Sequence, residues 1–353
     1  KKNNLFLLFF LLLNYSPPGI ATNIDGSSSM LVTYNRQLSN IKLNTLSTNY
    51  IKISSYLQKK TYFTASYELL LSSTNSINYT QASKKYRLLS LEEYGSDKSK
   101  IKIKQNINRL YIKQQLGPFS FLLGRDGFNF SNTNFISSVD IFPISLISIG
   151  TEEINGLDGI KTYYDISATS QFKLNYIFSE KKEIKKNIIA AEFSCTLENL
   201  DIKTTMLLFD SNILIATGLS SEIKTLQSYL ETSLTFGKND KAYLRSTLGL
   251  GKLWNTNWMS LIEYHYNEFG KSRYKEYEKL TQTYYYKNSY INMLARHYIS
   301  LSQTIPFSHI GNYQISITSN LNDSSLLLTN SFSHRIYDNL EIRGISFTPL
   351  VLN

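Results

Sequence analysis

Strict alternation of apolar and polar residues recurs along most of this chain and restricts its fold more than any other feature. In the segment 172–178, Phe172, Leu174 and Tyr176 alternate with Lys173 and Asn175. A similar period of two recurs in the segments 62–71, 160–167, 189–198 and 242–251. Successive side chains of a β-strand point to opposite faces, so this period indicates half-buried strands. Clusters of turn-forming residues separate the segments and give about 14 to 18 strand candidates, which predicts an all-β fold.

The composition excludes several other classes of protein. Charged residues make up 18% of the chain, below the roughly 25% of a typical soluble domain. No run reaches the ~18 apolar residues that a membrane-spanning helix needs. Aromatic residues make up 13%, with 26 Tyr and 19 Phe, and this content argues against disorder. The single cysteine, Cys195, excludes a disulfide framework and a cysteine-based metal site.

The first 21 residues have the pattern of a secretory signal peptide. Lys1 and Lys2 precede nine consecutive apolar residues, Leu5 to Leu13, and small residues follow at 19–22. Nine residues rise only ~14 Å as a helix, about half of the hydrocarbon thickness of a bilayer, which argues against a permanent anchor. We therefore expect cleavage after Ala21 and a single domain over residues 22–353.

Two architectures accommodate this many alternating strands: a soluble β-sandwich and an outer-membrane β-barrel. A barrel turns its apolar faces outward to lipid and its polar faces toward an aqueous lumen, whereas a sandwich does the reverse. The polar faces here carry charged residues, among them Lys161, Glu192 and Arg245. The aromatic content suits interfacial girdles, and a barrel leaves no free strand edge. We predict a single antiparallel transmembrane β-barrel of about sixteen strands, within a range of about 14 to 18.

Two long gaps interrupt the strand pattern, near residues 126–156 and 269–290. Loops of this length are usually either functional or disordered. The second gap is rich in Tyr and Lys, and its best helix candidate is Tyr274–Leu280. Pro349 interrupts a last strand, so the closing strand is expected near Leu340–Phe347 unless the chain is truncated.

Several segments resemble the porin-like outer-membrane proteins of Gram-negative bacteria. Phe119–Asp126 resembles the strand that carries "LGRQ" in that family, and Gly156–Asp165 resembles its "GxDGxKxxYD" strand. Further similar segments follow in the same order: Val139–Pro143, Glu263–Gly270, Ala295–Tyr298 and Asn320–Ser325. The resemblance implies an outer-membrane barrel that the barrel-assembly machinery inserts. It implies fold and location more than a particular solute.

Charged residues on the inward faces are candidates for lining such a pore, because rings of side-chain charge set ion preference. The pore-lining candidates are Arg109, Lys113, Arg125, Lys161, Lys173, Lys203, Arg245 and Arg296. The 126–156 loop is the candidate constriction loop, and its acids are Asp126, Asp140, Glu152 and Glu153. The net charge of +10 favours a mild anion preference. The alternative for each residue is a solvated position at the rim, because a one-residue error in strand phase reverses its face.

The sequence favours a channel over an enzyme. Among four histidines, His265 is the best candidate for a catalytic base, but no nucleophile elbow of the G-x-S-x-G type accompanies it. No cluster has metal-ligand spacing, so neither a metal nor another cofactor is expected, and no nucleic-acid motif accompanies the basic charge. The predicted function is passive diffusion of small hydrophilic solutes across the outer membrane. The alternative is a non-conducting adhesin or structural barrel acting through the 269–290 loop, and homo-oligomerisation stays open.

Overall fold

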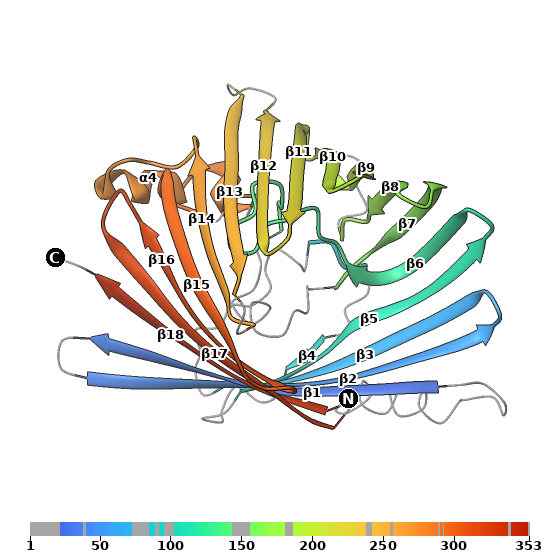
Figure 1. Cartoon of the computed structure of the whole chain (residues 1–353), viewed down its shortest axis with the longest axis horizontal. Coiled ribbons are helices and arrows are strands. Elements are labelled where there is room, and N and C mark those ends of the chain that lie inside the picture. The colour runs from blue at the N-terminus through green and yellow to red at the C-terminus, as the bar shows by residue number, and fades with distance from the viewer. Residues whose placement is uncertain are drawn as a thin grey trace.

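The structure is a computed structural model, and its strands form one sheet (Figure 1). It describes residues 22–37, 40–72, 85–88, 92–94, 102–142, 156–180, 186–237, 242–254, 257–288, 290–291, 293–337 and 340–351. The predicted signal peptide, residues 1–21, lies outside the described residues.

The sheet contains eighteen strands. The first nine are β1 (Thr22–Gln37), β2 (Asn40–Gln58), β3 (Thr61–Ser72), β4 (Glu92–Tyr94), β5 (Lys102–Leu116), β6 (Phe119–Gly127), β7 (Gly156–Ser167), β8 (Ser170–Ile177) and β9 (Ile188–Leu197). The others are β10 (Leu200–Phe209), β11 (Asn212–Ile223), β12 (Leu226–Phe236), β13 (Tyr243–Leu253), β14 (Met259–Asn267), β15 (His297–Ser308), β16 (Gly311–Asn320), β17 (Ser325–Tyr337) and β18 (Leu340–Val351).

Each long strand pairs antiparallel with the next long strand along the chain, and β4 adds a three-residue pairing to β5. β4 is a short additional strand, and the other seventeen strands alternate in direction along the chain. Because seventeen is an odd number, the first and the last strand run in the same direction. β1 therefore pairs in parallel with β18, from Gly26 to Thr33, and the pairings return to the first strand. The predicted all-β barrel fold is confirmed, with one parallel pairing where a wholly antiparallel barrel was expected.

The two ends of the sheet differ in their connections. At one end, which we call the turn end, eight strand pairs are joined by two residues in seven cases and by five residues in the eighth. Gly117 and Lys224, in two of these turns, have φ angles of 60° and 59°, the left-handed region that tight hairpin turns require. The opposite end, the loop end, carries all the long connections, including both predicted gaps.

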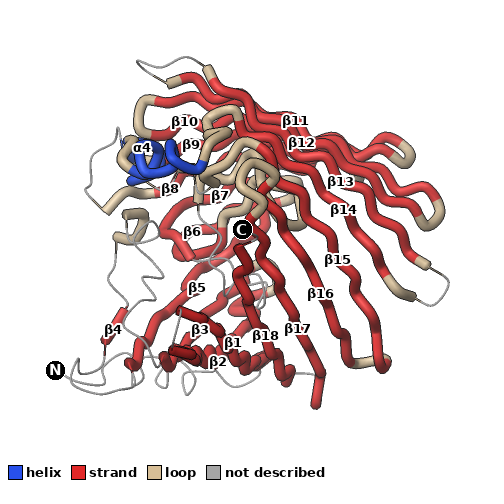
Figure 2. The backbone as a smooth tube through the Cα atoms, turned by 90° about the vertical axis from the view of Figure 1, so that its left-hand side faces the viewer, coloured by secondary structure: helices blue, strands red, loops and turns tan. Residues whose placement is uncertain are grey.

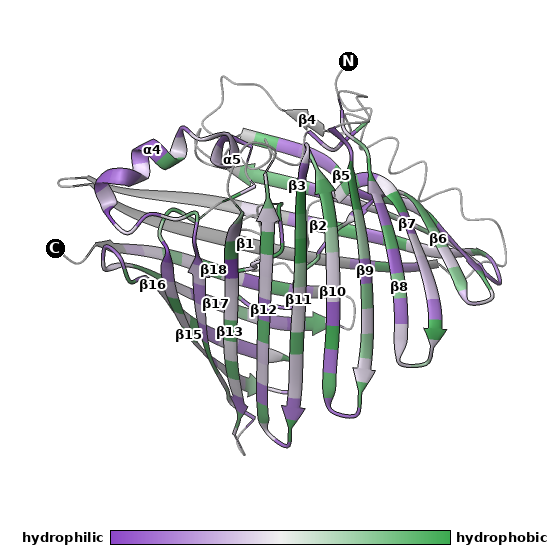
Figure 3. Cartoon of the chain, turned by 90° about the horizontal axis from the view of Figure 1, so that it is seen from above, coloured by the Kyte–Doolittle hydropathy of each residue, from purple (hydrophilic) through white to green (hydrophobic). Residues whose placement is uncertain are grey.

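Side chains alternate across the strands with apolar residues outside and polar residues inside. On β13, Leu248 is 48% exposed whereas Arg245 and Thr247 are buried. On β14, Ile262 is 41% exposed and its neighbour Glu263 only 1%. The same banding of green and purple runs along several strands in Figure 3. This is the polarity of a membrane barrel rather than of a sandwich, as the sequence predicts.

The gap near residues 269–290 contains short helices at the loop end (blue in Figure 2). A 3-10 turn at Tyr274–Glu276 leads into α4 (Tyr277–Thr281), and α5 (Tyr284–Lys287) follows. The expected helix at Tyr274–Leu280 thus forms. It extends one residue further, to Thr281, and its first turn is a 3-10 turn instead of an α-helical one. Within the described part of the chain, no helix has the length and apolar character needed to cross a membrane.

The last strand contains Pro349, contrary to the expectation that this residue interrupts it. β18 continues to Val351, and Pro349 pairs in register with Leu327 of β17. On its other side, β18 meets β1 only as far as Phe347. Pro349 therefore has a strand neighbour on one side only, the edge position where a missing N–H is tolerated.

Candidate functional site

The segment Phe128–Phe142, which follows β6, leaves the wall and lies inside the barrel against β12, β13 and β14 (Figure 1). We call it the inner loop. It is the described part of the predicted constriction loop, because residues 143–155, with Glu152 and Glu153, lie outside the described residues. Two carboxylates and an apolar cluster hold it in place.

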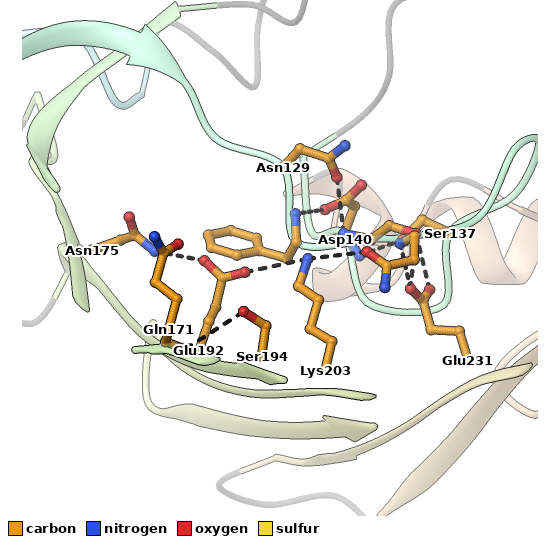
Figure 4. A network of polar contacts seen from close by, with 12 residues as sticks. Asn129, Ser137, Asp140, Gln171, Asn175, Glu192, Ser194, Lys203 and Glu231 are labelled. Carbon is orange, nitrogen blue, oxygen red and sulfur yellow. Dashed lines mark hydrogen bonds and ion pairs between the residues drawn. The ribbon is translucent and has the colours of Figure 1, made fainter. Parts of the chain in front are cut away.

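Glu231, on the inward face of β12, binds the inner loop at both ends of a tight curve (Figure 4). Its Oε2 accepts the backbone N–H of Asn132 at 2.9 Å, and its Oε1 accepts the N–H and hydroxyl of Ser138 at 3.0 and 2.9 Å. The hydroxyl of Ser131 lies 3.0 Å from both oxygens. A buried carboxylate is thus satisfied entirely by groups of the loop, which fixes the loop relative to the wall.

Glu263 of β14 holds the next part of the loop. Its Oε1 accepts the backbone N–H of Ile136 at 2.8 Å, and its Oε2 accepts those of Asn134 and Phe135 at 3.2 and 3.3 Å. The carbonyl of Ile136 in turn accepts the Thr247 hydroxyl at 3.0 Å. The loop has no regular secondary structure here, so the wall supplies the partners that its backbone needs.

Tyr229 supplies a further hydrogen bond to Glu263, and its side chain crosses a glycine to reach the carboxylate. The Tyr229 hydroxyl donates to Glu263 Oε2 at 2.5 Å, across Gly249 of the intervening strand β13. A Cβ on Gly249 would lie 2.0 Å from Cζ of the Tyr229 ring. Glycine is therefore required at this position for the ring to lie flat on the strand and reach the carboxylate.

Above these polar contacts, toward the loop end, the inner loop packs into a dry apolar cluster. Phe128, Phe130, Val139 and Ile141 are all at most 3% exposed. They pack in one cluster with inward residues of the wall and with the helical segment: Leu157, Ile177, Ile188, Ala190, Leu207, Phe209, Leu214, Ala216, Tyr285, Tyr290 and Ile291. On this side of the barrel, the wall near the loop end is therefore apolar on its inner face as well as its outer face.

Several charged residues of the wall beside and below the loop are paired with one another. Asp126 receives Lys161 Nζ at 2.5 Å and Arg109 Nε at 3.2 Å. Lys203 Nζ lies 3.3 Å from Glu192 Oε2 and also donates to Asn132 of the loop (Figure 4). These five charged residues lie on the inward faces of the strands, where they form ion pairs with one another.

Arg125 is enclosed rather than exposed to the lumen. Its Nε and Nη2 form a two-point ion pair with Asp158, at 2.7 and 3.0 Å, and its Nη1 donates to the carbonyl of Ile107. Gly124, just before it, has a φ of 134°, which no ordinary side chain adopts easily. Asp158 also accepts the N–H of Leu88, so this pair ties two neighbouring strands to the segment 85–88.

The remaining predicted site residues are dispersed. Lys113 and Lys173 approach the ring of Tyr163 from two sides, with their Nζ atoms 5.2 and 5.9 Å from its centroid. Arg296 precedes β15 and donates from Nε to the carbonyl of Gly270, so it braces the helical segment instead of lining the strands. Asp126 belongs to β6, not to the loop.

The space that stays open lies between the inner loop and the opposite wall. A cavity of 610 Å³ is lined on one side by loop residues and by Arg245 and His265. On the other side, β15, β16 and β17 line it with hydroxyl and amide side chains: Ser302, Thr304, Gln314, Ser316, Thr318, Thr329 and Ser331. No charged residue of these three strands is among the described residues that line the cavity.

Asp140 is the acid of the inner loop that faces this cavity. Its Oδ1 accepts the N–H of Phe130 at 2.8 Å, which closes the loop on itself. Burial, together with the charge of Glu231 and opposed by that hydrogen bond, raises the pKa of the Asp140 carboxyl to about 7. Lys203 and Arg245 act in the opposite direction. The loop thus carries one group that changes charge near neutral pH.

Glu231 and Glu263 are the important residues that the charge pattern does not single out. Both stand at inward positions of alternating segments, and each is the one acid of its strand: Glu231 stands among Leu, Thr and Ser, and Glu263 among Ile, Tyr and His. That isolation is the available signal, because a lone inward carboxylate must find donors from elsewhere in the chain. The sequence does not show that those donors are the N–H groups of a distant loop.

Known proteins resemble this chain in structure but not in sequence. No family model matches it, and no curated protein matches it. A triple mutant of the porin of Rhodopseudomonas blastica superposes with a TM-score of 0.54 over 89% of this chain and 98% of the porin, at 9% sequence identity. Two further variants of that porin give the same score over 88% of this chain and 98% of theirs, at 9% and 10% identity. The chain therefore has the fold of a porin β-barrel.

Proposed function

We propose that this protein is a channel for passive diffusion of small hydrophilic solutes across the outer membrane of a Gram-negative bacterium. The observation that carries the proposal is the 610 Å³ cavity between the inner loop and the hydroxyl-lined wall. Its walls carry hydroxyl and amide groups of β15, β16 and β17 among apolar side chains, so a hydrated solute can exchange part of its water for protein hydrogen bonds as it passes. The inner loop narrows the path of the solute through the lumen while it stays bound to the wall.

The location follows from the same features. In outer-membrane barrels, short turns face the periplasm and long loops face outward, so the turn end of this barrel is the periplasmic end. Residues 1–21 act as the signal peptide in this proposal, and the barrel-assembly machinery and outer-membrane lipid are the partners of residues 22–353. Apolar outward residues such as Leu123, 61% exposed, support contact with lipid. Assembly as a homo-oligomer stays open.

A second candidate is a barrel that does not conduct and acts through its outer loops. The observation in its favour is the dry apolar cluster, which occupies the loop end of the lumen over β7–β11. The helical segment above it also exposes Tyr274 and Tyr284, at 73% and 47%, where a partner can reach them. Such a protein is an adhesin or a structural component.

Conductance in a planar bilayer separates the two candidates. We expect the full chain, purified from membranes and shown to be folded by heat-modifiable gel migration, to give discrete ion-conducting steps. A folded protein that stays electrically silent would overturn the channel and support the second candidate. Reversal potentials in a salt gradient then test the mild anion preference, which a cation-selective value would contradict.

A further inference from the structure

Arg245 is a buried cation on β13 whose side chain lines the open cavity. It is 5% exposed, yet its Nε and Nη2 have no hydrogen-bond partner among the described residues. The other predicted arginines differ: Arg125 and Arg109 each make an ion pair. A guanidinium buried with free N–H groups is costly unless something supplies acceptors, and a ligand in the cavity is placed to do so.

The carboxylates near Arg245 are already engaged. Both oxygens of Glu231 accept N–H and hydroxyl groups of the inner loop. Asp140 Oδ1 accepts the N–H of Phe130. Within the described part of the chain, no carboxylate lies within the 4.0 Å of an ion pair to Arg245. These acids offset the charge of Arg245 at a distance but leave its hydrogen-bonding edge unused.

Side chains beside Arg245 place further hydrogen-bonding groups next to its unpaired N–H groups. Asn267 stands opposite it in the strand register, and its amide carbonyl Oδ1 is buried without a partner. His265, two register pairs further along and on the same face, has its Nδ1 2.7 Å from the Thr247 hydroxyl and lines the cavity. Arg245 therefore supplies a flat, two-point donor to an oxyanion, and Asn267 supplies an acceptor to a hydroxyl next to it.

The opposite wall of the cavity is chemically different. It presents Ser302, Ser316, Thr318, Thr329 and Gln314, which are uncharged and both donate and accept hydrogen bonds, alongside the apolar residues Leu327, Ile345 and Phe347. The volume of 610 Å³ lies within the roughly 300–1,000 Å³ of small-molecule sites. A molecule that fits both walls carries one oxyanion group and several hydroxyl groups.

We propose that the cavity is a binding subsite for hydroxylated organic anions, such as sugar acids or sugar phosphates, with Arg245 holding the carboxylate or phosphate group. The subsite rests on the proposed channel function and names the class of solute. It predicts that such a molecule interrupts the ion current when it enters, because it occupies the same cavity that the ions use.

The test measures block of single-channel current in the full-length folded protein by potassium gluconate, glucose 6-phosphate, acetate and glucose. We expect gluconate or glucose 6-phosphate to block at the lowest concentration, with the order of these two identifying carboxylate or phosphate as the preferred group. Acetate has the charge without the hydroxyls and glucose the hydroxyls without the charge, so each alone blocks weakly.

Arg245→Gln is the decisive variant, with Arg245→Lys and Lys60→Gln beside it. Loss of two charge-assisted hydrogen bonds raises the half-blocking concentration of gluconate about tenfold in Arg245→Gln. Arg245→Lys keeps the charge and loses the planar fork, so its half-blocking concentration falls between those of the wild type and Arg245→Gln. Lys60→Gln removes one positive charge from an exposed position at the turn end, in the recess that Lys59 and Tyr111 also line, and leaves block unchanged. Heat-modifiable migration confirms that each variant is folded.

The outcomes are distinguishable. Conducting steps that neither gluconate nor glucose 6-phosphate blocks overturn the subsite and leave the channel intact. Equal weakening of block by Arg245→Gln and Lys60→Gln assigns the effect to overall charge and also overturns it. If the folded barrel is silent, the channel proposal fails, and calorimetric titration of the same protein with gluconate decides the subsite: no heat of binding ends it.

Discussion

The two sides of the lumen use the same strand geometry for opposite purposes. On the side of β7–β11, inward residues near the loop end are apolar, as with Ile177, Ile188 and Leu207, and all three are completely buried. On the side of β15–β17, most of the inward residues that border the open cavity are hydroxyls and amides, as with Ser316 and Thr329, and Leu327 is the apolar exception among them. One side is filled, and the other side is left for solvent.

The difference shows how a barrel positions a loop inside itself. Apolar inward residues attract the apolar side chains of the inner loop, and burial of a side chain such as Phe130 or Ile141 contributes roughly 1.5–3 kcal/mol. A wall of hydroxyls gives no such gain, because it is well solvated by water. The carboxylates Glu231 and Glu263 stand at the boundary and satisfy the loop backbone there. The residue type on the inward face thus decides which part of the lumen closes.

The strongest way to break this contrast is to release the loop from the filled side. In the double variant Glu231→Gln, Glu263→Gln, an amide NH₂ replaces one acceptor oxygen at each site and opposes loop N–H groups. Each donor left unsatisfied costs about 1–3 kcal/mol, which is enough to undock the loop. We expect single-channel conductance to rise severalfold.

Glu222→Gln serves as the matched control for that experiment, because Glu222 is an exposed acid at the turn end of β11. Its conductance stays at the wild-type value. An unchanged conductance in the double variant, with its fold intact, would mean that the apolar cluster alone holds the loop.

A second experiment narrows the open side. Ser316→Trp places an indole in the cavity, and we expect the conductance to fall by about half because the ring takes up a large part of the free cross-section. Ile317→Trp, one residue along on the same strand, points outward to lipid, where Ile317 is 40% exposed, and leaves conductance unchanged. Equal effects of the two variants would place the conducting path elsewhere.

The sequence predicts the side of the wall on which a residue lies much better than the partner it finds there. Alternation places Lys161, Glu192 and Arg245 on the inner face, and all three lie there. It cannot show that Lys161 meets Asp126 while Arg245 meets no carboxylate of the described residues, because both outcomes depend on strand register and on the path of the inner loop. Arg125 departs from the alternation, because the positive φ of Gly124 breaks it.

The dry cluster also leaves a trace in the sequence. The runs Ile188–Ala191 and Met206–Phe209 are apolar at every position, where a half-buried strand alternates. A continuous apolar run indicates a strand buried on both faces. In a membrane barrel, one of those faces is lipid, so the other must meet something apolar inside. That inference predicts a filled lumen at this end, but it cannot name the loop that fills it.

A change of pH is expected to alter the docking of the inner loop on the filled side to a smaller extent, through the Asp140 carboxyl. The pKa of its carboxyl is about 7 in the docked loop, against an ordinary value of 3.8. Docking of the loop is therefore most stable below the ordinary value, weakens as the pH rises toward 7, and weakens no further above that. We expect conductance to decline modestly from pH 8 to pH 5, by less than the halving caused by Ser316→Trp.

Asp140→Asn isolates this group. Asparagine still accepts the N–H of Phe130 but does not titrate, so the conductance of the variant stays at the low-pH value throughout. The charges that face Asp140 are Glu231, Lys203 and Arg245. A pH response that survives in Asp140→Asn would therefore have to come from another group.

The smallest effect concerns the paired charges of the filled side. Lys203 is neutralised by Glu192 at 3.3 Å and lies beside the inner loop, whereas Arg245 lines the open cavity and makes no ion pair within the part of the chain that the structure describes. At an ionic strength of about 0.1 M, charge is screened over ~10 Å, so only residues at the path itself set selectivity strongly. Lys203→Gln should move the reversal potential in a KCl gradient by a few millivolts toward cation preference, clearly less than Arg245→Gln. A larger shift of the reversal potential for Lys203→Gln than for Arg245→Gln would show that ions pass through the side of β7–β11. The open side and the filled side would then have to be exchanged.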